Sequence, residues 1–123
     1  MSKILITGAA GFIGSRLFNK LKLKHEVLGV DFNLKEKLHK KIINLDLINE
    51  KETSKLVNDF HPSFVFHLAA FAGPPRNEKN PEFAYKYNVD ILKSLLKSLN
   101  ENTKIFFPST DKIFEGNSFP DET

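Results

Sequence analysis

The sequence predicts an α/β fold built on a doubly wound, all-parallel sheet. Short apolar runs alternate strictly with segments of helical periodicity along the chain, which is typical of βαβ units. Three of the six glycines stand at three-residue spacing in TGAAGFIG, directly after the first apolar run. Right-handed crossovers, two on each face of the sheet, give the strand order 3-2-1-4-5.

Five apolar runs bounded by turn signals are the predicted strands: residues 3–7, 26–31, 42–47, 63–70 and 104–110. Helical spacing of apolar residues predicts three helices: one from residue 12, one that follows a capping box at Asn49 and Glu52 and runs to about residue 61, and one that begins at Asn80-Pro81. The strand order reverses between the first and fourth strands, so we expect a ligand in the crevice above their carboxyl ends.

Composition indicates one small domain over residues 1–123, with no second domain. The absence of cysteine excludes disulfides and thiolate metal sites. We find no signal-peptide pattern and no apolar stretch long enough to span a bilayer, so we expect a cytoplasmic protein with no membrane association. The net charge is +3, but the lysines lack interleaved aromatic residues, which favours a solvated face over nucleic-acid binding.

The spacing of the glycines predicts a phosphate cradle. Gly8 would allow a tight turn, Gly11 would let the backbone approach an anion, and Gly14 would let the following helix lie close on the sheet. The helix would begin near Phe12 with its unpaired amides and its dipole directed at that anion. A glycine-rich turn with a purely structural role is the alternative, but the strand before it and the helix after it favour the cradle.

Asp31 closes the second predicted strand about twenty residues after the glycines, where a carboxylate can accept hydrogen bonds from both hydroxyls of an adenosine ribose. Its charge would repel a 2′-phosphate, and no arginine follows nearby, so NAD is favoured over NADP. The alternative is that Asp31 only caps the following connection, as Asp does at many strand ends.

A set of motifs in this order resembles the extended short-chain dehydrogenase/reductase family: TGAAGFIG, Asp31, Asp46-Leu47, HLAA at 67–70, Asn88-Val89 and FFPST at 106–110. That family includes the NAD-dependent epimerases and dehydratases that act on nucleotide sugars. The resemblance covers essentially the whole chain. It implies an NAD(P)-binding Rossmann domain whose full-length relatives take a nucleotide-sugar substrate.

The resemblance also implies roles for single residues. Backbone amides at Phe12 and Ile13 would hold the pyrophosphate, with Gly8, Gly11 and Gly14 shaping the turn and Asp31 on the ribose. Asp46 and Leu47 would flank the adenine, with the carboxylate taking its amino group. The implied floor of the cofactor site consists of Leu68, Ala69 and Ala70.

Two further roles follow from the resemblance. Asn88 would brace the loop around the cofactor, although it could instead cap the helix or face solvent. Thr110, with Ser109 one step back, would contact the reacting sugar oxygen, the one catalytic-site residue that this chain supplies. His67 belongs to the HLAA run and, with His61, lacks a third metal ligand, so we expect a packed histidine and no metal site.

The family's catalytic Tyr-x-x-x-Lys pair is absent, because neither Tyr85 nor Tyr87 has a lysine four residues later. We therefore expect the nucleotide-binding part of an epimerase, dehydratase or reductase, truncated before the substrate lobe and inactive alone, so that enzymatic activity of this chain stays open. Lys112 in STDKIFEG departs from the dehydratase pattern and is closer to the dTDP-4-dehydrorhamnose reductase branch. The alternative is a non-catalytic NAD-binding module or sensor that works with a partner.

The predicted fifth strand would present an exposed apolar edge at residues 105–107, where its outer neighbour is missing. Such an edge favours self-association. We therefore expect either a homodimer or a separate C-terminal partner chain.

Overall fold

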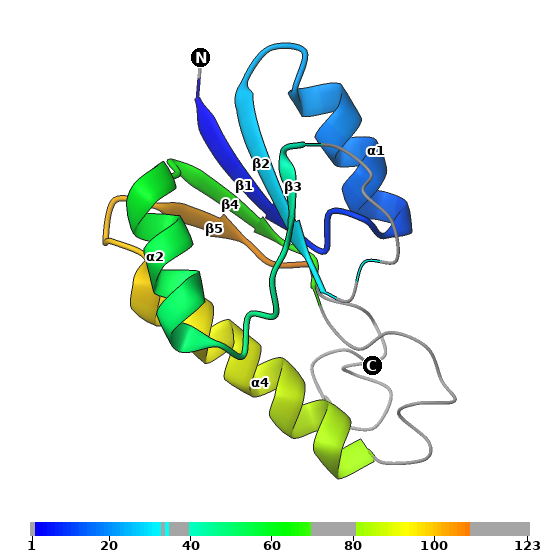
Figure 1. The fold of residues 1–123 in the computed structure, drawn as a ribbon, viewed down its shortest axis with the longest axis vertical. Helices are drawn as coiled ribbons and strands as arrows, with labels where there is room; N and C mark the ends of the chain where they lie inside the picture. Colours follow the sequence, from blue (N-terminus) through cyan, green and yellow to red (C-terminus); the bar gives the residue numbers. More distant parts are fainter. Residues whose placement is uncertain (1, 33, 35–39, 70–80, 109–123) are drawn as a thin grey trace, which may run out of the picture.

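The structure is a computed structural model that describes residues 2–32, 34, 40–69 and 81–108 (Figure 1). Two residues predicted for the site, Ala70 and Thr110, lie outside the described residues. The elements, in chain order, are β1 (Lys3–Thr7), α1 (Phe12–Leu21), β2 (Glu26–Asp31), β3 (Ile42–Asn44), α2 (Glu50–Phe60), β4 (Phe64–His67), α4 (Pro81–Ser98) and β5 (Lys104–Phe106).

All five strands pair in parallel in the order β3-β2-β1-β4-β5, which confirms the predicted doubly wound fold. Thr7 is in register with Val30 on one side and His67 on the other. The carboxyl ends of β1, β2 and β4 therefore meet at one edge of the sheet, and α4 begins at this same end of the molecule (Figure 1). The ligand site that the sequence predicts falls at this edge.

Three strands are shorter than predicted. β3 ends at Asn44 and not at residue 47. The Leu45 amide still donates to the Asp31 carbonyl, but the chain then leaves the sheet, and the side chains of Leu45 and Leu47 are buried in the core. β4 ends at His67 and not at residue 70. The Leu68 amide still donates to the backbone carbonyl of Thr7 as well as to its hydroxyl, whereas the Ala69 amide binds the Thr7 hydroxyl. β5 ends at Phe106, two residues before Pro108, which has no amide to donate.

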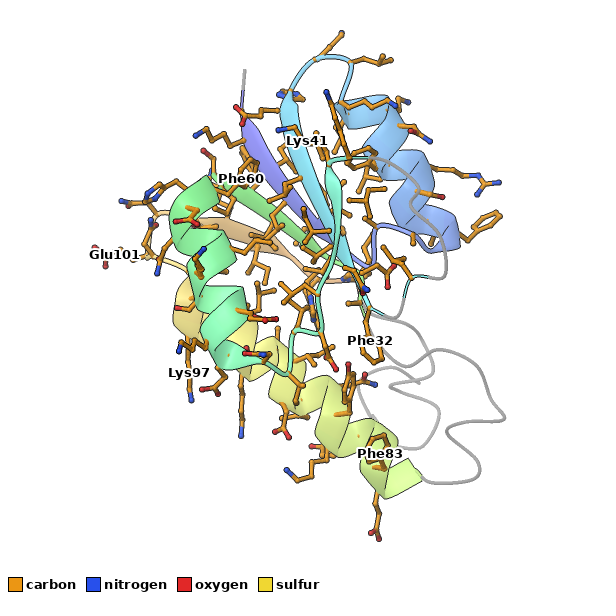
Figure 2. The ribbon with its side chains drawn as sticks, in the orientation of Figure 1. Phe32, Lys41, Phe60, Phe83, Lys97 and Glu101 are labelled. Atoms are coloured by element: carbon orange, nitrogen blue, oxygen red, sulfur yellow. The ribbon has the colours of Figure 1, made fainter. Side chains whose placement is uncertain are left out.

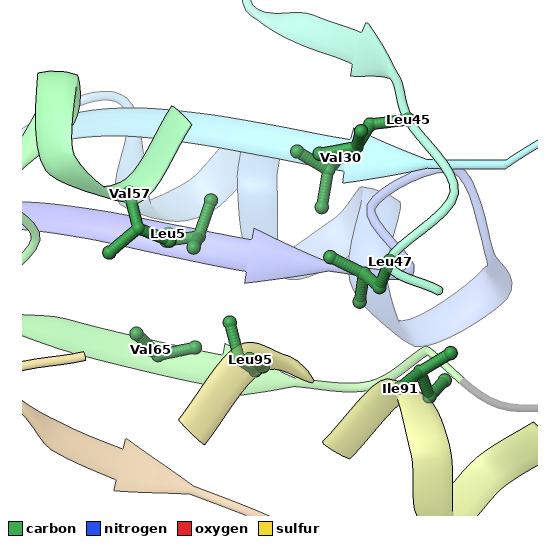
Figure 3. Packing of buried hydrophobic residues seen from close by; sticks show 8 residues of the cluster. All are labelled: Leu5, Val30, Leu45, Leu47, Val57, Val65, Ile91 and Leu95. Carbon is green, nitrogen blue, oxygen red and sulfur yellow. The ribbon is translucent and has the colours of Figure 1, made fainter. Parts of the chain in front are cut away.

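Two apolar layers cover the two faces of the sheet, as the crossover rule predicts. On one face, Phe18 of α1 packs with Ile4, Ile6 and Val27. On the other face, side chains from the sheet and from the segment after β3 meet α2 and α4. Figure 3 shows this larger cluster, which consists of Leu5, Val30, Leu45, Leu47, Val57, Val65, Ile91 and Leu95.

The helix termini follow from local sequence. Asn49 caps α2 by accepting a hydrogen bond from the Glu52 amide at 3.1 Å, which is one half of the predicted capping box. The Asn49 amide instead donates to the backbone carbonyl of Asp46. His61 closes α2 in the left-handed conformation, with φ of 55°. Within the described residues, no helix has the length and apolar character needed to cross a membrane.

β5 is an edge strand of the described sheet. Phe106 and Phe107 are 58% and 54% exposed, so the predicted apolar edge is confirmed at these two positions. Ile105 differs, because it packs partly against the larger core cluster.

Candidate functional site

The glycine loop, residues 8–11, lies directly against the chain segment that follows β4. Gly8 has φ of 72°, a conformation that favours glycine. A Cβ on Gly8 would lie 2.8 Å from the carbonyl carbon of Leu68 and 2.9 Å from the amide nitrogen of Ala69. The turn closes with a hydrogen bond of 3.1 Å from the Gly11 amide to the Gly8 carbonyl. Gly8 is therefore needed both for the turn and for the approach of the two loops.

Gly14 faces the turn that directly follows β1. A Cβ at this position would overlap the carbonyl oxygen of Gly8 and lie 3.0 Å from the Cα of Ala9. Gly14 therefore lets α1 lie close on the backbone that directly follows β1. The effect is to fix the helix start against the turn.

The N-terminus of α1 is open. Gly11 is the N-cap and has no side chain to occupy the amides, and the first turn contains no acidic residue. In an α-helix the first amides have no acceptor within the helix, which here applies to Phe12 and Ile13. Both side chains are largely exposed. Such a helix start is suited to an anion.

Asp31 ties the end of β2 to the glycine loop. Its Oδ2 accepts a hydrogen bond of 2.8 Å from the Ala10 amide, and its Oδ1 accepts one of 2.7 Å from the Phe32 amide. The bond to Phe32 agrees with the capping alternative, whereas the bond to Ala10 was not foreseen. Each carboxylate oxygen can accept a second donor, so ribose hydroxyls would not have to displace these amides. The ribose contact remains a prediction.

A buried hydroxyl joins the ends of β1 and β4. Thr7 Oγ1 accepts hydrogen bonds from the amides of Leu68 at 3.0 Å and Ala69 at 3.1 Å, and it lies 2.7 Å from His67 Nδ1. Its two lone pairs are then occupied, so the hydroxyl proton is directed to Nδ1. His67 is therefore the neutral tautomer with its proton on Nε2. We call these contacts the Thr7–His67 network.

His67 is a packed histidine, as predicted. It is 3% exposed, and its ring stacks on that of Phe107 with centroids 6.0 Å apart. Burial lowers its pKa to about 4, so the imidazole stays neutral near pH 7. Among the described residues, no group of three or more histidine and acidic side chains is placed to hold a metal ion.

Asp46 lies beside Tyr87, which the sequence indicated only as a tyrosine without the lysine of a catalytic pair. The Tyr87 hydroxyl on α4 donates a hydrogen bond of 2.6 Å to Asp46 Oδ1, which also accepts one of 3.1 Å from the Ile48 amide. Burial, the bond to Asp46 and the negative charges of Asp46 and Asp31 raise the pKa of Tyr87 far above its ordinary value. A signal was present, because Tyr87 precedes Ile91 by four residues and so falls on the buried stripe of α4, where a hydroxyl needs a partner.

The remaining predicted residues lie in three kinds of place. Leu47 is buried in the larger core cluster. Leu68 and Ala69 are half-buried beside the glycine loop, and Asn88 is half-buried on α4. The structure thus brings Gly8, Asp31, Leu68 and Ala69 to one edge of the sheet, while their contacts with a cofactor stay predictions.

An open groove of about 530 Å³ lies elsewhere, between β3 and α2. Its apolar wall includes Leu28, Leu56 and Phe60. It contains none of the residues predicted to bind a cofactor. The candidate site is therefore defined by hydrogen bonding at the carboxyl edge of the sheet and not by this groove.

Comparison with known proteins agrees with this geometry. The chain is 29% identical to dTDP-4-dehydrorhamnose reductase of Aggregatibacter actinomycetemcomitans over 94% of its own length and 37% of that protein. It is 30% identical to methionine adenosyltransferase 2 subunit beta of Xenopus tropicalis, over 96% of its own length and 35% of the relative. The chain thus spans little more than a third of these relatives.

A solved structure shares the fold. The UDP-glucose 4-epimerase of Thermus thermophilus, in complex with NAD, is 27% identical with a TM-score of 0.70, covering 78% of this chain and 33% of that one. Residues 4–123 match the sequence profile of the NAD dependent epimerase/dehydratase family. The chain therefore belongs to the NAD-dependent epimerase/dehydratase family.

Proposed function

We propose that this chain is the NAD-binding domain of a nucleotide-sugar epimerase, dehydratase or reductase. The observation that carries the proposal is the glycine loop, held by Asp31 on one side and approached by the backbone of residues 68 and 69 on the other, in front of an uncapped helix. Relatives named as a sugar-nucleotide reductase and an epimerase with NAD support the same class. A cytoplasmic location is part of the proposal.

The residues at this edge fit a dinucleotide. Amides at Phe12 and Ile13 would take the diphosphate, because no acidic side chain competes for them. The Asp31 carboxylate would accept the ribose hydroxyls, and its negative charge, fixed against the loop, disfavours the 2′-phosphate of NADP. Asp46 would accept the adenine amino group, and Leu47 would lie beside it. When bound, the nicotinamide supplies hydride transfer.

We propose that residues 1–123 alone turn over no sugar nucleotide at a useful rate. The Tyr-x-x-x-Lys pair is not in this sequence, and loss of a general base alone costs about a hundred- to ten-thousand-fold in rate. Incubation of the chain with NAD and several UDP- and dTDP-sugars, with product analysis, tests the point. Clear turnover would contradict it.

Calorimetry tests the binding function directly. We expect the wild-type chain to take up NAD, and Gly11→Val to abolish the uptake, because a side chain there would occupy the anion's approach to the loop. Asn19→Val, on the exposed face of α1, is the matched control and should bind normally. Circular dichroism establishes that each variant is folded. Absence of NAD uptake by folded wild-type protein would overturn the proposal.

A non-catalytic module that works with a partner is the second candidate. One relative is named as a subunit of methionine adenosyltransferase 2, which favours this alternative. The exposed Phe106 at the end of β5 and Phe107 directly after it offer an apolar edge for self-association or for a C-terminal partner chain. Sedimentation of the chain alone should show concentration-dependent association, and monomers at every concentration would count against an edge interaction.

A further inference from the structure

A series of hydrogen bonds leads from the glycine loop to α4. The Ala10 amide binds the Asp31 carboxylate, and the Asp31 carbonyl accepts a hydrogen bond of 2.8 Å from the Leu45 amide. The next residue, Asp46, accepts the hydroxyl of Tyr87. Asp31 also acts on Tyr87 through its charge. Tyr87 therefore stands at the corner where β2 and β3 end, close to both carboxylates.

The two carboxylate oxygens of Asp46 accept different numbers of hydrogen bonds. Within the described part of the chain, both hydrogen bonds to this carboxylate end on Oδ1, one from Tyr87 and one from the Ile48 amide. An oxygen of an ionised carboxylate has about two acceptor positions, so Oδ1 is saturated. Oδ2 is left as the acceptor for a ligand. With two donors on one oxygen, the carboxylate has a fixed rotation and a defined outward atom.

The Tyr87 ring is held in place from two directions. It stacks on Phe83, one helical turn earlier, with ring centroids 6.1 Å apart, and it packs against the larger core cluster. Phe83 lies on the first turns of α4, as Figure 2 shows. The phenol stays protonated under ordinary conditions, because burial and the neighbouring carboxylates oppose its ionisation. It is a permanent donor on a rigid support.

We propose that Tyr87 is a positioning residue that fixes the Asp46 carboxylate for the amino group of adenine, and so makes the site select an aminopurine over a ketopurine. The inference rests on the proposed function, because it assumes that the dinucleotide's base lies at Asp46. An ionised carboxylate can accept but cannot donate. Hypoxanthine carries a carbonyl where adenine carries the amino group. Its carbonyl oxygen and Asp46 Oδ2 would then face each other as two acceptors with no donor between them.

The test compares NAD with its hypoxanthine analogue, nicotinamide hypoxanthine dinucleotide, by titration calorimetry. For the wild-type chain we expect NAD to bind about tenfold more tightly, which corresponds to one charge-assisted hydrogen bond. In Tyr87→Phe the ratio should fall to about two or less, through weaker NAD binding. Tyr85→Phe is the matched control, because that side chain is 74% exposed, and its ratio should equal the wild-type ratio.

Asp46→Asn tests the same arrangement from the other partner. Tyr87 and Ile48 both donate, so the side-chain carbonyl oxygen of the substituted residue would stay on them and its NH₂ would take the place of Oδ2. The preference should then invert in favour of the hypoxanthine dinucleotide. In the double variant Asp46→Asn with Tyr87→Phe, the inversion should shrink or vanish, because the amide has lost its main constraint.

The outcomes separate the inference from the proposed function. Failure of folded wild-type chain to bind either dinucleotide overturns both. Binding of NAD with a ratio that is unchanged in Tyr87→Phe overturns the inference alone. Equal weakening of both dinucleotides in Tyr87→Phe and Asp46→Asn also overturns it, because a merely structural role would act on the two ligands alike.

Discussion

Two regions at the carboxyl edge of the sheet are built differently. At the ends of β1 and β4, the Thr7–His67 network is buried and neutral, and the lone pairs of the Thr7 hydroxyl are both occupied. At the ends of β2 and β3, Asp31 and Asp46 are half-buried and charged. Their hydrogen bonds within the described residues do not occupy all the acceptor positions of the two carboxylates. The difference indicates that the Thr7–His67 network is a structural frame that holds the chain segments together. The Asp31 and Asp46 carboxylates instead have acceptor positions available for a ligand.

The strongest way to break the frame is Thr7→Val, which keeps the shape and removes the hydroxyl. The Ala69 amide and His67 Nδ1 would lose their shared partner, while the Leu68 amide would keep the Thr7 carbonyl, so the free energy of unfolding should fall by about 4 kcal/mol. Thr103→Val, whose hydroxyl bonds to Pro62 near the surface, should cost about 1 kcal/mol. Urea unfolding measures both. Equal losses would show that the Thr7–His67 network contributes no more to stability than a single hydrogen bond near the surface.

Gly8→Ala attacks the contact between the two loops. The left-handed φ and the approach of the Leu68 backbone both oppose a Cβ, so we expect a loss of about 3 kcal/mol. Gly11→Ala is the control: its Cβ would meet only the Gly8 carbonyl, at 3.3 Å, and the cost should be about 1 kcal/mol. A Gly8→Ala protein as stable as wild type would contradict the described loop contact.

Acid should weaken the frame through His67. The unfolded imidazole, with pKa near 6.5, takes up a proton as the pH falls, whereas the folded one, with pKa about 4, does not. Stability from this group is therefore complete above pH 6.5 and is lost as the pH falls toward 4, with about 2 kcal/mol gone by pH 5. His67→Asn should flatten this part of the pH profile. Parallel profiles for the two proteins would refute the assignment.

The smallest expected effect belongs to the charged end. Asp31→Asn keeps an oxygen for one backbone amide but removes the charge, so stability should fall by about 1 kcal/mol. The affinity for NADP relative to NAD should rise several-fold, because the repulsion of the 2′-phosphate is gone. Parallel calorimetry with both dinucleotides measures the ratio. An unchanged ratio would show that Asp31 acts on the loop and not on the ribose.

The parts of the site that local sequence determines were predictable. The glycine spacing and the alternation of apolar runs with helical segments predicted the fold and the strand order, both of which are confirmed. The pairings Ala10–Asp31, Tyr87–Asp46 and Thr7–His67 were not foreseen, because they join residues 21, 41 and 60 positions apart and depend on how strands, loops and α4 pack together. The ends of β3 and β4 escaped prediction for a related reason. Leucines that leave a ladder for the core look the same in sequence as leucines that continue it.

The hydroxyl of Thr7 also bears on when the site forms during folding. The glycine-rich turn lies at the start of the chain, yet its shape is secured by amides sixty residues later, at Leu68 and Ala69. Contacts over such a separation form after local ones, because the closure of the intervening chain must come first. A peptide that ends after β2 would contain the three glycines and Asp31. It would still lack the backbone of Leu68 and Ala69, against which the glycine loop packs. Competence to bind should therefore arise only when β4 docks beside β1.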